Sequence, residues 1–156
     1  MKITDIEVTE LVIPWLERVR EPMTQTMGGT ERTFLYRVRT DEGLVGVGEG
    51  GDHRRALGRY LGHDPAEFLL GRYPEPLQEA IYDLVGQRLA VPVHRLLGPQ
   101  HRERVEAAFW SIDMSPSEAA AEAQAAVDGG YRVHKLKVRP WQDFIEQARQ
   151  MFAVAP

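Results

Sequence analysis

Apolar and polar positions alternate in three segments near the start of the chain, a pattern typical of strands with one buried face. The segments cover 3–13, 33–40 and 44–49. The Asp-Glu-Gly sequence at 41–43 separates the last two, and a glycine in so short a connection favours a hairpin. The pattern therefore predicts a three-stranded antiparallel sheet.

The stretch between the first two predicted strands has no visible hydrophobic period. Residues 15–32 include Pro22 and the adjacent pair Gly28 and Gly29. A connection of this length exceeds the usual ~4–6 residues, and long connections often serve as lids or binding loops. We expect a structureless lid here, with a surface loop of no function as the alternative.

Helical signals follow the predicted hairpin. Asp64 to Glu67 reads as a capping box with proline at the first helical position. A helix is predicted from near Pro76 to Leu89, because its apolar residues keep helical spacing, and a short turn is predicted over 93–97. Strands followed by helices predict an α+β domain.

The order of elements changes in the last third of the chain. A largely apolar strand is predicted over 105–112, and a helix begins at the capping box of 115–118. A second strand follows over 131–138, and a further helix from Pro140 onward. Alternating β and α elements predict two parallel strands joined by a right-handed crossover.

Composition narrows the class of protein. The chain is 43% hydrophobic and 27% charged, with a net charge of -4 and no cysteine. These values predict a packed core, and exclude disulfides and thiolate metal sites. The charge offers no basic face for nucleic acid, and neither a signal peptide nor an apolar run of ~20 residues is visible. We expect a soluble cytoplasmic protein that binds neither nucleic acid nor membrane.

Two lysines in the last predicted strand are the candidate chemistry. Residues two apart share a face of a strand, so Lys135 and Lys137 point the same way with Cα atoms about 7 Å apart. Lys137 lies at the carboxyl end of the strand, where barrel enzymes assemble their sites. On spacing alone, the solvated face of an edge strand remains the alternative, because lysine is rarely buried.

Short segments along the whole chain carry a family resemblance. In chain order they are 1–4, 38–43, 48–50, 80–86, 91–93, 96–98, 130–132 and 135–137. Through these segments the chain resembles the mandelate racemase and muconate lactonizing branches of the enolase superfamily. Ala90 and Pro99 stand where the family commonly has glycine, and neither touches the proposed chemistry.

This resemblance implies an N-terminal capping domain over 1–100, and the first two β/α units of an incomplete (β/α) barrel over 101–156. It also implies Mg²⁺-dependent abstraction of the proton α to a carboxylate, through an enediolate. The expected activity of the full-length protein is dehydration of an acid sugar. Racemisation, epimerisation or cycloisomerisation is the alternative within the superfamily, and an inactive fragment or a non-catalytic binding module is the alternative outside it.

The resemblance also implies roles for particular residues. Lys137 would be the base, and Lys135 would contact the substrate carboxylate and favour the neutral form of Lys137 by charge repulsion. Met23, Thr24 and Met27 are candidate substrate contacts in the lid. His53 is a weaker candidate in a neighbouring loop, since an exposed histidine is more often without a role.

Other parts of such a site are expected outside this chain. The resemblance implies that the Mg²⁺ ligands and the second base lie on later barrel strands. It further implies a small carboxylate substrate and, at full length, a homo-oligomer. Two parallel strands cannot cover both faces or edges, so we expect residues 1–156 alone to be poorly stable or oligomeric, without turnover.

Overall fold

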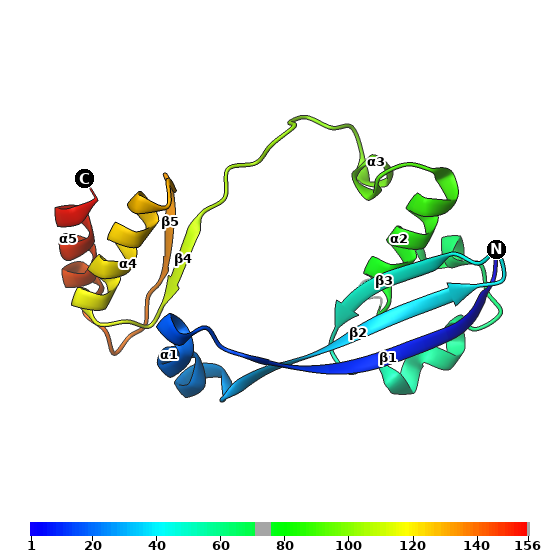
Figure 1. Cartoon of the computed structure of the whole chain (residues 1–156), viewed down its shortest axis with the longest axis horizontal. Coiled ribbons are helices and arrows are strands. Elements are labelled where there is room, and N and C mark those ends of the chain that lie inside the picture. The colour runs from blue at the N-terminus through cyan, green and yellow to red at the C-terminus, as the bar shows by residue number, and fades with distance from the viewer. Residues whose placement is uncertain (71–75, 156) are drawn as a thin grey trace. The chain divides into compact units, whose positions relative to one another are not determined.

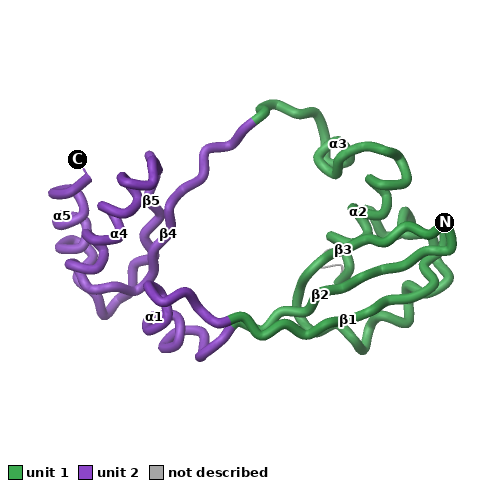
Figure 2. Tube along the Cα trace, viewed as in Figure 1, with its two compact units in different colours: residues 1–13, 31–103 green, residues 14–30, 104–156 purple. Residues whose placement is uncertain are grey.

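The chain divides into two units, shown in separate colours in Figure 2. Unit 1 comprises residues 1–13 and 31–103, and unit 2 comprises residues 14–30 and 104–156. This computed structural model describes residues 1–70 and 76–155. Pro156, the last residue of the predicted second domain, lies outside the described residues.

The first unit contains the predicted three-stranded sheet (Figure 1). Its strands are β1 (Ile3–Pro14), β2 (Thr30–Thr40) and β3 (Val45–Gly50), in the order β1-β2-β3. β2 and β3 pair antiparallel, and Gly43 in their turn has a φ of +80°. The antiparallel sheet and its glycine turn are thus confirmed.

Helical segments follow the sheet. These are the 3-10 helices η1 (Arg54–Tyr60) and η2 (Pro65–Phe68), and the α-helices α2 (Gln78–Leu89) and α3 (Val93–Leu97). The predicted capping box at Asp64 is present, although it opens only a four-residue 3-10 helix. The predicted turn over 93–97 is a short α-helix instead.

The core of unit 1 forms between the sheet and α2. Phe34, Tyr36 and Val38 alternate along β2 and are buried, as a strand with one covered face requires. Ile81 and Leu84 of α2 are fully buried against them. Burial of each such side chain contributes about 1.5–3 kcal/mol.

α2 lies so close to β3 that it covers the free edge of the sheet (Figure 1). A Cβ atom on Gly46 would lie 2.3 Å from the carbonyl oxygen of Ala80, so only glycine permits this approach. The Val47 N–H donates to Asp83 (2.9 Å), and the Glu49 N–H donates to Glu79 (3.0 Å). Carboxylates of a helix thus satisfy donors that an edge strand leaves unpaired.

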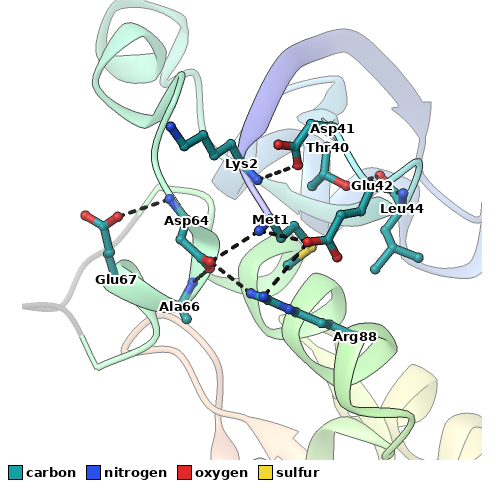
Figure 3. Close-up of polar contacts among 10 residues, drawn as sticks. All are labelled: Met1, Lys2, Thr40, Asp41, Glu42, Leu44, Asp64, Ala66, Glu67 and Arg88. Carbon is teal, nitrogen blue, oxygen red and sulfur yellow. Dashed lines mark hydrogen bonds and ion pairs between the residues drawn. The ribbon is translucent and has the colours of Figure 1, made fainter.

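An ion cluster joins the ends of several elements of unit 1 (Figure 3). The Met1 ammonium lies 2.8 Å from Glu42 and 3.6 Å from Asp64, and Arg88 lies 2.8 Å from Asp64. Burial opposes ionisation of Asp64, but hydrogen bonds from the Ala66 N–H and Arg88 outweigh it and lower the pKa of Asp64. The cluster ties the start of β1 to the β2–β3 turn and to α2.

The second unit contains the predicted β-α-β-α sequence. Its elements are β4 (Phe109–Ile112), α4 (Pro116–Asp128), β5 (His134–Lys137) and α5 (Phe144–Val154). β4 and β5 pair in parallel, and the Ser115 capping box opens α4, as predicted. Both strands are shorter than predicted: residues 104–108 have no regular structure, and Val105 is 80% exposed. Apolar composition does not extend a strand where no neighbouring strand pairs with it.

Residues 15–32 correct the prediction of a structureless lid, because they include a helix. α1 (Glu17–Met27) belongs to unit 2 and contains Pro22. Only Val19 and Met23 are buried on this helix, and two buried positions are too few to show a helical period in the sequence.

Every helix in residues 1–70 and 76–155 is too short or too polar to span the hydrocarbon core of a membrane.

Candidate active site

The two predicted lysines lie side by side on one face of β5. Lys135 and Lys137 are exposed, whereas His134 and Leu136 are partly buried, so the side chains alternate as predicted. Lys135 is in register with Trp110 of β4, and Lys137 with Ile112. The chain contains sixteen arginines but only three lysines, and two of the three are on this strand. The compact, flexible ammonium group is thus concentrated at one place.

The opposite face of the two strands contains a partly buried hydrogen bond between two polar side chains. The Ser111 hydroxyl and the His134 imidazole are hydrogen-bonded through Oγ and Nε2. Burial lowers the pKa of His134, Glu122 opposes this, and Arg18 adds to the lowering. Nδ1 of His134 is buried without a hydrogen-bond partner within the described part of the chain. His134 therefore belongs to the packing of the unit in its neutral form.

α1 packs against the carboxyl end of β4, where Ile112 is in register with Lys137 of β5. Val19 and Met23 of α1 form a buried cluster with Ile112 and Met114. Ile112 is the register partner of Lys137, so the segment predicted as a lid touches the strand beside the lysine strand. The residues of the predicted lid that pack against β4 thus belong to a helix and not to a loop.

Arg18 extends the contact of α1 around the free edge of β4. The Phe109 N–H donates to the Val133 carbonyl (2.9 Å), so the Trp110 carbonyl, one residue on, points away from β5. Arg18 donates to that carbonyl at 3.4 Å and forms an ion pair with Glu122 of α4. This edge of the parallel pair is thereby capped by a side chain.

The remaining predicted contacts occupy varied environments. Met23 is only 7% exposed and is part of the cluster just described, whereas Thr24 and Met27 are exposed. His53 lies in unit 1, where its backbone N–H donates to the Tyr36 hydroxyl (2.9 Å). Contact with substrate stays a prediction for each of the four.

A polar cluster at the carboxyl ends of the two strands was not predicted. Asp113 directly follows β4, is 7% exposed and has a φ of +32°. Its carboxylate accepts from Nε1 of Trp141 (2.9 and 3.1 Å) and from Nε2 of Gln142 (3.2 Å). The sequence signal was an acid placed directly after an apolar strand, where barrel enzymes carry functional groups.

The described residues do not fit a complete metal site. Residues 1–70 and 76–155 contain no group of three or more His, Cys, Asp or Glu side chains placed to hold a metal ion. Divalent cations such as Mg²⁺ are bound by several oxygen ligands. The described residues therefore do not supply a complete set of ligands for such an ion.

Comparison with known proteins gives a consistent set of relatives. No family model matches the chain. It is 24% identical over 168 residues to an N-succinyl-L-Arg/Lys racemase from Bacillus cereus, a match to 88% of this chain and 44% of the racemase. It is 29% identical over 149 residues to a D-galactonate dehydratase from Pectobacterium atrosepticum, a match to 78% of this chain and 39% of the dehydratase. The chain thus spans less than half the length of these curated relatives.

Solved structures agree with this set. A dipeptide epimerase from Methylococcus capsulatus, complexed with Mg ion, has a TM-score of 0.74 at 24% identity, over 99% of this chain and 48% of the epimerase. A member of the enolase superfamily from Roseovarius nubinhibens has a TM-score of 0.75 at 23% identity, over 99% of this chain and 48% of its own. In sequence and in fold, the chain is similar to enolase-superfamily proteins of the mandelate racemase and muconate lactonizing branch, and it spans about half of their length.

Proposed function

We propose that this chain supplies the lysine half of a site that abstracts the proton α to a carboxylate. Lys137 accepts the proton through its neutral Nζ, and an enediolate forms on the substrate. Lys135, two residues before it on the same face, binds the substrate carboxylate as a cation. An amine base and an adjacent cation suit this reaction, because negative charge develops on the carboxylate as the proton leaves.

The pairing of the lysines carries the proposal. Both are exposed on one face of a short parallel strand, and Lys137 is its last residue. A parallel strand seldom has a solvated face, so two cations there are unusual unless they serve a site. Two of the three lysines of a chain with sixteen arginines lie on β5, and this concentration supports a chemical rather than a solubilising role.

The ligands of the metal that this reaction would use lie outside the described residues. Mg²⁺ would stabilise the negative charge of the enediolate. The relatives support this dependence, since the dipeptide epimerase was solved with Mg ion. Our proposal for this chain is limited to the two lysines and the strand that holds them.

Two overall reactions begin with this step. Loss of water from an acid sugar is favoured by the match to D-galactonate dehydratase, the more identical of the two curated relatives described above. Inversion at the α-carbon is favoured by the matches to the racemase and the epimerase. Incubation of the full-length protein with galactonate and with an N-succinyl amino acid separates them. The first reaction releases a dehydrated keto acid, and the second changes optical rotation without changing mass.

Exchange of the α-proton in D₂O tests the shared step. Lys137→Ala in the full-length protein should lower Mg²⁺-dependent deuterium incorporation by about 10²–10⁴-fold, the usual contribution of a general base. Lys2→Ala is the matched control, because Lys2 is the one lysine of residues 1–156 that lies outside β5, and it should leave the rate unchanged. Undiminished exchange in Lys137→Ala would assign the base to another residue.

A further inference from the structure

The face of β5 that carries the two lysines continues onto β4. Register partners in a parallel pair point to the same face of the sheet, and neighbouring strands lie about 4.8 Å apart. Trp110 is the register partner of Lys135, and Ile112 is the register partner of Lys137. An indole and an aliphatic side chain therefore stand beside the two ammonium groups.

Contacts on the opposite face of the two strands support this arrangement. The centroids of the Phe109 and His134 rings lie 5.3 Å apart, and the Ser111 hydroxyl is hydrogen-bonded to the same imidazole. Phe109 and Ser111 thus point away from the lysines. Because side chains alternate along a strand, Trp110 and Ile112 point to the face that carries the lysines.

α1 packs behind the apolar side chains of this face. Val19 and Met23 of α1 form a buried cluster with Ile112, and Trp110 packs against that cluster. Figure 1 shows α1 beside the carboxyl end of β4. Ile112 is only 1% exposed, whereas Trp110 is only partly buried. Trp110, held in place by this cluster, therefore keeps apolar surface that a ligand can contact.

We propose that Trp110 is a specificity-determining residue that binds an apolar substituent of the substrate. This inference rests on the proposed function, in which Lys135 binds the carboxylate and Lys137 takes the α-proton. A substrate held in this way lies over the lysine face, and Trp110 is the neighbour of Lys135 across the two strands. An apolar group near the α-carbon is removed from water when it packs against the indole, and this stabilises the complex.

The substrate class that follows is a carboxylic acid with an apolar substituent near its α-carbon. An acid sugar suits these surroundings less well, because its hydroxyl groups would face aromatic and aliphatic side chains. A hydroxyl that leaves water without gaining a hydrogen bond lowers the affinity. Of the two overall reactions above, Trp110 therefore favours inversion of an acid with an apolar substituent over dehydration of a polyhydroxy acid.

Binding of hexanoate and acetate to the full-length protein with Mg²⁺ tests the proposal without turnover. Both probes carry one carboxylate, and only hexanoate carries an apolar chain. Titration calorimetry should give a Kd for hexanoate about tenfold below that for acetate. Trp110→Ala should raise the Kd for hexanoate about tenfold and leave that for acetate unchanged. Wild-type protein without this preference, or Trp110→Ala with the preference intact, would overturn the proposal.

Gluconate tests the alternative substrate class, because it has the chain length of hexanoate but carries hydroxyl groups. Its Kd should be the same in the wild type and in Trp110→Ala. A tenfold loss for gluconate, with no loss for hexanoate, would assign Trp110 to an acid sugar and overturn the proposed class.

Matched variants separate contact with the ligand from support of α1. Trp110→Phe keeps an aromatic ring and should keep most of the preference for hexanoate, whereas Trp110→Gln should lose it. Phe109→Leu changes the adjacent aromatic residue on the opposite face and should leave the preference unchanged. The preference is a ratio of two Kd values from one preparation, so partial unfolding of a variant does not alter it. Equal losses of preference in Phe109→Leu and Trp110→Ala would contradict a direct contact.

The outcome is distinguishable from failure of the proposed function. If Lys135→Gln binds both probes like the wild type while Trp110→Ala weakens hexanoate alone, the role of Lys135 is wrong and that of Trp110 stands. If Lys137→Ala loses α-proton exchange while Trp110→Ala binds hexanoate like the wild type, only the role of Trp110 is wrong.

Discussion

Ala90 has a strained backbone conformation, which lowers the stability of the folded chain. It ends α2 with φ +54° and ψ +38°, a left-handed conformation that suits glycine. Ala90→Gly should therefore raise the free energy of unfolding by about 1 kcal/mol, measured by chemical denaturation. Ala125→Gly, inside α4 and exposed, should lower it by a similar amount. A loss of stability in Ala90→Gly would contradict the backbone described here.

His134 makes the stability of unit 2 depend on pH. Its pKa lies below 6.5 in the folded chain, chiefly because of burial, so the unfolded chain takes up the proton first as pH falls. The stabilising contribution is complete above pH 6.5 and is lost as the pH falls through the lower folded-state pKa. Urea unfolding at several pH values should show this loss, and His134→Gln should flatten it.

The control for this measurement is His101→Gln, which changes an exposed histidine. It should leave the pH dependence as in the wild type. An equally steep pH dependence in His134→Gln would show that another group titrates in this range.

The lysine pair was predictable at the scale of residues, whereas its surroundings were not. A spacing of two in a strand places Lys135 and Lys137 on one face whatever the tertiary structure. The contact of Asp113 with Trp141 joins residues 28 positions apart, and no local pattern encodes it.

At the scale of elements, α1 is the clearest difference from prediction. Pro22 and the following glycines are typical of loops, and only two apolar residues mark its buried side. Its position depends on β4, more than eighty residues later in the chain, so the helix is stabilised by tertiary packing rather than by propensity. Helices with long and regular apolar faces, such as α2, were predictable because their pattern is local.

Two methionines of α1 test whether the helix is packed. Met23 is 7% exposed within the cluster of Ile112 and Met114, and Met27 is 60% exposed. Met23→Ala should lower the free energy of unfolding by about 2–3 kcal/mol, because it leaves a cavity. Met27→Ala should change it by less than about 0.5 kcal/mol. Equal effects of the two substitutions in denaturant unfolding would contradict a packed α1.

At the scale of the whole molecule, each of the two units is stabilised by contacts of its own. Unit 1 is stabilised by the β2–α2 core and by the ion cluster around Met1 and Arg88. Unit 2 carries the lysine strand and the helix that packs against β4. The order of strands and helices predicted both sets of elements, because sheet and βαβ patterns are local. It did not predict that 14–30 belong with unit 2, because that depends on contacts between distant segments.

Deuterium incorporation at the substrate α-carbon by a Lys137→Arg variant is the most direct test of the central claim. Arginine keeps the positive charge of position 137 but does not give up its proton at working pH, so it separates a base from a mere cation. The full-length protein with Mg²⁺ in D₂O should lose exchange in this variant and keep it in Lys2→Arg. Exchange at the wild-type rate in Lys137→Arg would contradict the assignment of Lys137 as the base.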